Sequence, residues 1–237
     1  MQFMILDGKV ALVTGASSGI GKAIAEMLME ARVKIIGTYN RGRIDSKKIF
    51  PVHMDLKSEK SIVHGFQKIA DQYHSIDILI NSAGINTGGG IFDLRVWRDV
   101  FEVDLFGLVS VTEKGVKLMN NGGKIINISS VYSDGKASWK GVPAYAAAKA
   151  AVSNFTQTLA KNLAPKILVN AVAPGYVDTP IWGKYSAEVK EASKKESLIE
   201  RFVTPEEVAS VVIELARSDA MTGEIIVVDG GLSLKTI

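Results

Sequence analysis

Residues 9–21 read KVALVTGASSGIG, an apolar run that leads directly into a glycine-rich turn. The run from Lys9 to Thr14 lacks polar alternation, which is typical of a strand buried on both faces. The glycines at positions 15, 19 and 21 then open a segment of helical period. Such a turn lets the backbone approach a pyrophosphate, and the free N–H groups at the helix start favour its negative charge. The stretch therefore predicts the first strand, turn and helix of a nucleotide-binding α/β fold.

The rest of the chain repeats this order of strand and helix. Further apolar runs predict strands at residues 34–38, 52–55, 76–80, 124–128, 167–172 and 224–228. Segments of helical period predict helices at 19–31, 58–73, 94–119, 144–163 and 205–216, the last with Thr204 as N-cap and Pro205 as its first residue. The alternation predicts one doubly wound Rossmann domain over residues 1–237, with a mostly parallel sheet of about seven strands and helices on both faces. Residues 38–51 leave too little room for a crossover helix, so we expect a loop there.

The composition excludes several classes of function. The 237 residues contain no Cys, which excludes disulfides, thiolate nucleophiles and Cys-type zinc sites, and no metal site is expected. The 28 basic and 25 acidic residues are too balanced for a nucleic-acid surface. No apolar run approaches the ~20 residues that span a bilayer, and the first residues lack the features of a secretion signal. We expect a cytoplasmic protein that binds neither nucleic acid nor membrane.

Two other motifs overlap the glycine-rich turn. Residues 15–19 match the G-x-S-x-G elbow of hydrolases, but the three histidines, His53, His64 and His74, all stand early and none follows a late acid. Gly21-Lys22 resembles the end of a phosphate loop, but Ala16 and Ala23 stand where that loop needs Gly and Ser or Thr. Neither motif is complete.

Tyr145 and Lys149 are four residues apart in an Ala-rich helical segment, so they share one face. A free phenol has a pKa of ~10, and proton transfer near neutral pH requires that value to be lowered. A partly desolvated ammonium and the positive end of a nicotinamide can lower it. Ser130 follows a predicted strand, where its hydroxyl would face the ligand crevice.

Together these residues resemble the short-chain dehydrogenase/reductase family. The resemblance rests on Thr14-Gly15-x-x-x-Gly19-x-Gly21, Asn81-Ser82-Ala83-Gly84, Ser130, Tyr145-x-x-x-Lys149 and Pro174-Gly175, and it extends to Val228-Asp229-Gly230-Gly231. It implies an oxidoreductase that transfers hydride between a nicotinamide cofactor and a secondary alcohol, ketone or sugar. Tyr145 would be the acid/base, Ser130 would hydrogen-bond the substrate oxygen, and Lys149 would bind the nicotinamide ribose while lowering the pKa of Tyr145.

The resemblance also implies the cofactor contacts. The phosphates would meet Gly15, Ser17, Ser18, Ile20 and Gly21; the adenine would meet Asp55 and Leu56; the ribose side would meet Asn81, Ala83 and Gly84; and the carboxamide would meet Pro174, Val177 and Thr179. The second strand ends in Tyr39-Asn40-Arg41-Gly42-Arg43, which lacks the acid that grips a ribose 2′-OH. Arg41 or Arg43 could bind a 2′-phosphate, so the segment favours NADP over NAD, unless Asp45 reaches back over the loop.

Asp104 departs from the family pattern, which has Asn at this position to support a water that links the lysine to solvent. An ionised carboxylate can accept the water's hydrogen bond but cannot donate one. We include Asp104 among the catalytic candidates; the simpler interpretation is a helix residue that faces water. The departure also leaves open a nucleotide-binding sensor with little catalysis.

The substrate is expected to lie under residues 180–201, which we interpret as a lid with a helix from Ser186 to Arg201. Trp139, Trp182 and Tyr176 are candidates for an apolar or sugar-stacking wall. The alternative substrate is a 3-oxoacyl thioester. Relatives that reduce thioesters on an acyl carrier protein often have arginines at the positions of Asn121 and Pro165, which are uncharged here. By the same resemblance, helices 94–119 and 144–163 would pair in a homodimer or homotetramer.

Overall fold

The computed structural model describes residues 4–135 and 141–234, so Trp139 lies outside the described residues. Within these ranges, seven strands form one sheet: β1 (Val10–Val13), β2 (Lys34–Tyr39), β3 (Ile49–His53), β4 (Ile76–Asn81), β5 (Met119–Ile128), β6 (Ile167–Pro174) and β7 (Ile225–Val228). The strand order is β3-β2-β1-β4-β5-β6-β7, and every neighbouring pair is parallel. The order reverses between β1 and β4, where sheets of this kind bind ligands beyond the carboxyl ends of their strands. The predicted doubly wound fold is confirmed.

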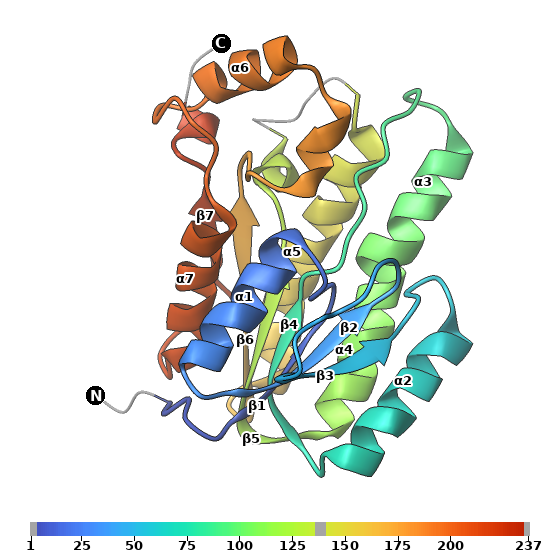
Figure 1. Ribbon diagram of the computed structural model, residues 1–237, viewed down its shortest axis with the longest axis vertical. Coiled ribbons are helices and arrows are strands. Elements are labelled where there is room, and N and C mark those ends of the chain that lie inside the picture. The colour runs from blue at the N-terminus through green and yellow to red at the C-terminus, as the bar shows by residue number, and fades with distance from the viewer. Residues whose placement is uncertain (1–3, 136–140, 235–237) are drawn as a thin grey trace.

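Helices cover both faces of the sheet (Figure 1). Their bounds are α1 (Gly19–Glu30), α2 (Glu59–Gln72), α3 (Leu94–Phe101), α4 (Leu108–Lys117), α5 (Pro143–Leu163), α6 (Ala187–Glu196) and α7 (Pro205–Arg217). Side chains of α1 and α7 share one core with the sheet, and side chains of α2, α4 and α5 share the other. Among the described helices, none is long and apolar enough to cross a membrane.

The central strands are apolar without alternation because they face a core on both sides, whereas the edge strands β3 and β7 are partly exposed. In β1, Leu12 belongs to the core under α2 and α4, while Val13 belongs to the core under α1 and α7, and both are fully buried. Burial on both faces makes each strand side chain contribute about 1.5–3 kcal/mol of transfer free energy. This double burial fixes the sheet whose carboxyl edge carries the site.

The segment 40–48 forms no helix, as expected, but β3 begins at Ile49 rather than at residue 52. α7 begins as predicted, with Thr204 and Glu207 forming a reciprocal capping box and Pro205 in the first turn. The lid helix is shorter than predicted: α6 begins after Ser186, whose hydroxyl accepts from the Val189 N–H, and ends at Glu196 instead of residue 201.

The helix predicted over 94–119 runs without a break only to Lys117, and it contains a π-helical turn that the sequence did not indicate. α3 ends at Phe101, a π-helical turn runs from Glu102 to Gly107, α4 follows to Lys117, and Met119 already belongs to β5. The wide turn lies close to the chain after β3: a Cβ built on Gly107 would lie 2.7 Å from the Leu56 Cβ and carbonyl oxygen. A π turn inserts one residue into an α-helix and barely changes the apolar period, so the sequence pattern does not reveal it.

Candidate functional site

A long cleft crosses the carboxyl ends of β1, β2, β3 and β4. It contains most of the predicted cofactor residues: Gly15, Ser17, Ser18, Ile20, Gly21, Tyr39, Asn40, Arg41, Asp55, Leu56, Ala83, Gly84 and Thr179. The residues come from segments as distant as the first turn and the chain after β6, and the sheet topology alone brings them together. The dimension of the cleft along the strand ends suits an extended ligand such as a dinucleotide.

The glycine-rich turn is folded tightly at one side of this cleft. Gly15 has φ +69°, and a Cβ there would lie 3.0 Å from the Ala83 Cα. A Cβ on Gly21 would lie 2.5 Å from the Gly15 carbonyl oxygen. Ser18 caps α1 without a side-chain hydrogen bond, so its hydroxyl is available to a ligand at the helix N-terminus. These features fit a phosphate cradle, because small residues let the backbone N–H groups reach the anion.

The end of β2 forms the far side of the cleft. The Asn40 amide donates to Asp55 Oδ1 at 3.2 Å, and the Tyr39 ring meets the His53 ring edge-on at 5.6 Å between centroids. Arg41 is exposed and lines the cleft. Asp45 does not reach back into the cleft, because it pairs with Arg43 at 2.6 Å from Nε. Arg41 is thus the cation of this loop that faces the cleft.

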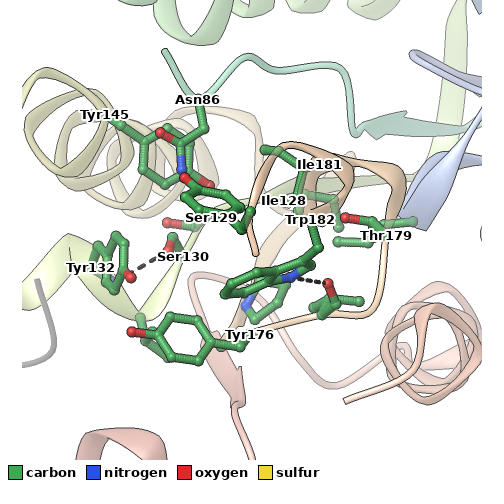
Figure 2. A pocket seen from close by; sticks show the side chains of 16 residues that line it. Asn86, Ile128, Ser129, Ser130, Tyr132, Tyr145, Tyr176, Thr179, Ile181 and Trp182 are labelled. Carbon is green, nitrogen blue, oxygen red and sulfur yellow. Dashed lines mark hydrogen bonds between the residues drawn. The ribbon is translucent and has the colours of Figure 1, made fainter. Parts of the chain in front are cut away.

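A second pocket, of about 770 Å³ with its open mouth, adjoins the cleft. Ile20, Thr179 and Ile181 line both spaces. Ser130 after β5 and Tyr145 on α5 line the pocket, as do Trp182 and Ile181 from the segment after β6 (Figure 2). Pro174 and Val177 also line it. A group bound where the two spaces meet would therefore adjoin the pocket that Tyr145 lines.

The side of the pocket formed by the chain after β6 is aromatic and held by hydrogen bonds. The Trp182 indole donates to the Val177 carbonyl oxygen at 2.9 Å and stacks on Phe202 at 4.4 Å between ring centroids. The Tyr176 hydroxyl donates to Glu196 Oε2 at 2.7 Å, which ties the end of α6 to the pocket wall. Of the predicted wall residues, Trp182 and Tyr176 both line the pocket.

Ser130, Tyr145 and Lys149 are brought together where β5 ends and α5 begins. The Ser130 hydroxyl oxygen accepts from the Tyr132 N–H at 3.2 Å, which leaves its own proton free for a second contact. Lys149 is 4% exposed, lies 5.5 Å from the centre of the Tyr145 ring, and donates to the Ile128 carbonyl oxygen at 3.0 Å. The spacing of four along α5 thus puts the ammonium beside the phenol ring.

The protein surroundings raise the pKa of Tyr145 above its ordinary value. Burial is the largest cause of the rise, and the negative charge of Asp104 also raises the pKa. The positive charge of Lys149 and a hydrogen bond with Ser130 lower the pKa. Burial alone would lower the pKa of Lys149, but the charges of Asp104 and Tyr145 raise it above its ordinary value. Lys149 alone therefore does not bring the pKa of Tyr145 below its ordinary value.

Asp104 is 0% exposed, so its interpretation as a solvent-facing helix residue is wrong. Its Oδ1 accepts from the Ile85 N–H at 2.8 Å, and its Oδ2 lies 3.3 Å from Lys149 Nζ in an ion pair. Burial raises the pKa of Asp104 above its ordinary value, although the charge of Lys149 and the Ile85 N–H oppose this rise. The π-helical turn thus places this buried carboxylate next to the Lys149 ammonium.

Three of the predicted site residues line neither space: Lys149, Asp104 and Asn81. Asn81 lies at the end of β4. It is buried and its amide donates to Thr112 Oγ1 at 3.0 Å and Asn127 Oδ1 at 2.8 Å. These contacts join β4, α4 and β5 beneath the cleft, so the residue supports the ribose side rather than forming its surface.

Several residues at the site had no sequence signal. Lys57 lies in the loop between β3 and α2, and Asp99 lies on α3. Both line the cleft and form an ion pair at 2.8 Å. Asn86 and Tyr132 line the pocket, and Asn86 Oδ1 is buried without a hydrogen bond. Lys57 and Asp99 are 42 residues apart in the chain, so no local motif marks the pair. In residues 4–135 and 141–234, no group of three or more His, Cys, Asp or Glu could hold a metal ion.

Comparisons with known proteins agree with this geometry. A family model described as enoyl-(acyl carrier protein) reductase matches residues 15–233. A 3-oxoacyl-[acyl-carrier-protein] reductase of Aquifex aeolicus is 42% identical over 96% of this chain and 98% of its own length. The ligand-free aldohexose dehydrogenase of Thermoplasma acidophilum superposes with a TM-score of 0.91, at 31% identity, over 99% of this chain and 97% of that one. A short-chain dehydrogenase of Burkholderia cenocepacia in complex with NADP superposes with a TM-score of 0.86, at 26% identity, over 97% of this chain and 99% of that one.

Proposed function

Because the chain belongs to the short-chain dehydrogenase/reductase family of oxidoreductases, we propose that it interconverts a secondary alcohol or sugar and the corresponding carbonyl compound with NADP(H), using Tyr145 as the acid/base. The observation that carries the proposal is that the pocket lined by Ser130 and Tyr145 adjoins the long cleft. The two spaces share Ile20 and Thr179.

A nicotinamide dinucleotide fits the residues present. The fit rests on the close packing of Gly21 on Gly15, where a Cβ would lie 2.5 Å from the carbonyl oxygen, and on the uncapped N-terminus of α1. Gly15, Ser17, Ser18, Ile20 and Gly21 would hold the phosphates, Asp55 and Leu56 the adenine, Ala83 and Gly84 the ribose side, and Pro174, Val177 and Thr179 the carboxamide. When bound, the cofactor supplies or accepts the hydride.

The cofactor is proposed to be NADP rather than NAD. No carboxylate stands at the end of β2 to grip a ribose 2′-OH, since the segment reads Tyr39, Asn40, Arg41. Arg41 lines the cleft and can form charge-assisted hydrogen bonds to a 2′-phosphate. Arg43 is paired with Asp45 and supports the loop instead.

The chain's own residues move the proton. In reduction, the Tyr145 hydroxyl gives its proton to the carbonyl oxygen as that oxygen becomes an alcohol; in oxidation the phenolate takes the proton back. Ser130 accepts from the Tyr132 N–H and can therefore aim its own O–H at the substrate oxygen. Lys149 is held by the Ile128 carbonyl oxygen, and its remaining N–H groups can serve the nicotinamide ribose.

The substrate proposed first is a compact alcohol, ketone or sugar. The aromatic lid side, built from Trp182 and Tyr176, suits the apolar face of a ring, and the buried Asn86 Oδ1 offers a hydrogen-bond acceptor. The alternative is a 3-oxoacyl thioester, which the similarity to a carrier-protein reductase supports. Asn121 and Pro165, which are uncharged, weigh against docking of an acidic carrier.

The test is an activity screen of aldoses, small ketones and 3-oxoacyl thioesters with both dinucleotides. Turnover is measured by the absorbance of the reduced nicotinamide. Turnover of aldoses or ketones with NADP supports the first substrate class, and turnover confined to thioesters supports the alternative. Binding of dinucleotide without turnover of any substrate would instead favour a nucleotide sensor and overturn the enzymatic proposal.

A cytoplasmic homodimer or homotetramer is proposed for the assembly. Phe106 lies in the π-helical turn between α3 and α4 and is 56% exposed, as an apolar side chain covered by a second copy would be. Light scattering of the purified protein measures the assembly, and a monomer at micromolar concentration would contradict it.

A further inference from the structure

Asp104 is held in one position by three separate parts of the chain. Oδ1 accepts from the Ile85 N–H after β4, and Oδ2 lies 3.3 Å from Lys149 Nζ on α5. On its other side, a Cβ built on Gly84 would lie 3.0 Å from Oδ2, so even a methyl group would crowd the carboxylate. The residue itself is carried by the π-helical turn Glu102–Gly107, which packs against α5. The side chain therefore has little freedom to turn away from Lys149.

Oδ2 is buried and receives no hydrogen bond, although it belongs to an ion pair. The attraction between Asp104 and Lys149 is thus chiefly electrostatic. The Lys149 ammonium donates instead to the Ile128 carbonyl oxygen at 3.0 Å. Both charges are almost completely buried, where the dielectric constant is low and screening by salt is weak.

The charged and titratable groups around Tyr145 come from three elements. Lys149 lies on its own helix, Asp104 comes from the π-helical turn, and Ser130 and Tyr132 follow β5. Lys149 is the cation among the groups that act on Tyr145, and its field favours the phenolate. The negative charge of the Asp104 carboxylate beside it opposes that field. An uncharged amide in the same place would leave the field of Lys149 intact.

We infer that Asp104 is a positioning residue which, by pairing with Lys149, keeps the proton on Tyr145 at neutral pH and thereby sets the site for carbonyl reduction. The step concerned is proton transfer: the O–H bond of Tyr145 breaks, its proton forms the new O–H bond of the alcohol, and the phenolate regains a proton from solvent. Oxidation needs the phenolate at the start, so it is expected to require alkaline pH. This inference rests on the proposed role of Tyr145.

The test compares the Asp104→Asn variant with the wild type in two ways. Tyrosinate absorbance in the ultraviolet is titrated in the protein without cofactor, and the signal of Tyr145 is isolated by subtracting the same titration of Tyr145→Phe made in each background. In the Asn variant we expect phenolate formation at lower pH. The acidic limb of the kcat/KM profile for oxidation should move the same way, so that oxidation at a fixed pH on that limb rises about tenfold.

Asp219→Asn is the matched control. Asp219 also pairs with a buried lysine at 2.6 Å, but this lysine is Lys124 in the middle of β5, before the strand end that Ser130 follows. Its removal should leave both the tyrosinate titration and the pH profile of catalysis unchanged. A residue that merely stabilises the fold would lower thermal stability without moving either readout.

Coincident titrations and coincident pH profiles of the wild type and the Asn variant would overturn the inference, as would a shift to higher pH. If the Asn variant does not fold, Asp104→Ser removes the same charge with a smaller side chain and should give the same shift. A carbon NMR titration of the wild type provides a further measurement, since the inference requires Asp104 to be ionised at neutral pH and a protonated carboxyl contradicts it. Should no substrate be turned over, the proposed function fails while the tyrosinate titration still decides this point.

Discussion

Gly21 packs against Gly15 so closely that a Cβ on Gly21 would lie 2.5 Å from the Gly15 carbonyl oxygen. The contact joins the first turn of α1 to the turn that follows β1, and both glycines line the cleft. Two glycines six residues apart thus act as one unit, because the second has to be small for the first to keep its φ of +69°. The atoms opposing a larger side chain are backbone, which cannot rotate away.

Gly21→Ala is therefore expected to deform the phosphate cradle. Overpacking of this kind costs about 1–3 kcal/mol, so we expect lower thermal stability and a dinucleotide Kd raised about tenfold or more. The measurements are thermal unfolding and calorimetric titration with NADP and NAD. Gly90→Ala is the control, since a Cβ there would meet nothing within 4 Å. Unchanged dinucleotide binding in Gly21→Ala would mean that the cleft binds its ligand elsewhere.

Arg41→Ala should weaken NADP binding selectively. A charge-assisted hydrogen bond contributes about 1.5–3 kcal/mol, so the Kd for NADP should rise about 10- to 100-fold while the Kd for NAD stays the same. Arg43→Ala is the matched control on the same loop, because Arg43 is already paired with Asp45 at 2.6 Å. Fluorescence titration with each dinucleotide measures the effect. Equal losses for the two dinucleotides, or an equal effect of Arg43→Ala, would refute the assignment of Arg41.

The sequence predicted the fold well because the central strands of this sheet face two cores. Continuous apolar runs such as Ala11–Val13 have few other interpretations, and the glycine-rich turn that follows β1 fixes the first crossover. Boundaries were less accurate where the chain changes element without a polar break. Met119 enters β5 two residues after α4 ends at Lys117, so helix and strand merge in one apolar pattern.

At the site, spacing predicted neighbours on one helix but not partners from other elements. The interval of four residues correctly put Lys149 beside the Tyr145 ring. The resemblance put Asp104 near Lys149 through a water, but the sequence does not indicate a direct ion pair or the contact of the ammonium with the Ile128 carbonyl oxygen. Those contacts depend on the π-helical turn and on the end of β5. Asn81 shows the converse: its motif suggested a cleft residue, yet its amide is used by Thr112 and Asn127.

Tyr145→Phe is expected to remove turnover while leaving the dinucleotide cleft intact. Loss of a positioned acid/base lowers kcat by about 10²–10⁴-fold, whereas the Kd for NADP should change by no more than about twofold, since the hydroxyl faces the pocket rather than the phosphate cradle. Steady-state rates with the best substrate of the screen and calorimetric cofactor titration measure the two effects. Tyr73→Phe is the control, because Tyr73 packs on Phe50 at the end of α2, away from both spaces. A variant with most of its rate would exclude Tyr145 as the proton donor.

Glu207 should make the start of α7 sensitive to acid. Its carboxylate accepts from Arg201 Nη1 at 2.8 Å and Nη2 at 2.7 Å and from the Thr204 N–H at 2.8 Å. The Arg201 hydrogen bonds, followed by that of the Thr204 backbone, lower the pKa of Glu207 from 4.5 to about 2. A lowered carboxyl pKa stabilises the fold fully above the unfolded value of 4.5, and this stabilisation is lost as the pH falls toward about 2.

Glu207→Gln is therefore expected to be less stable than the wild type at neutral pH, with a difference that shrinks as the pH falls below 4.5. Because the Arg201 and Glu207 side chains are 51% and 42% exposed, solvent screens the pair, and we expect a loss of only about 1 kcal/mol, or a Tm lower by about 2–4 °C. Urea unfolding across the pH range measures the difference. Glu214→Gln, which breaks the exposed pair with Arg217 on the same helix, should have a smaller effect. A difference between wild type and Glu207→Gln that stays constant down to the lowest accessible pH would show that the carboxylate charge contributes nothing at this helix start.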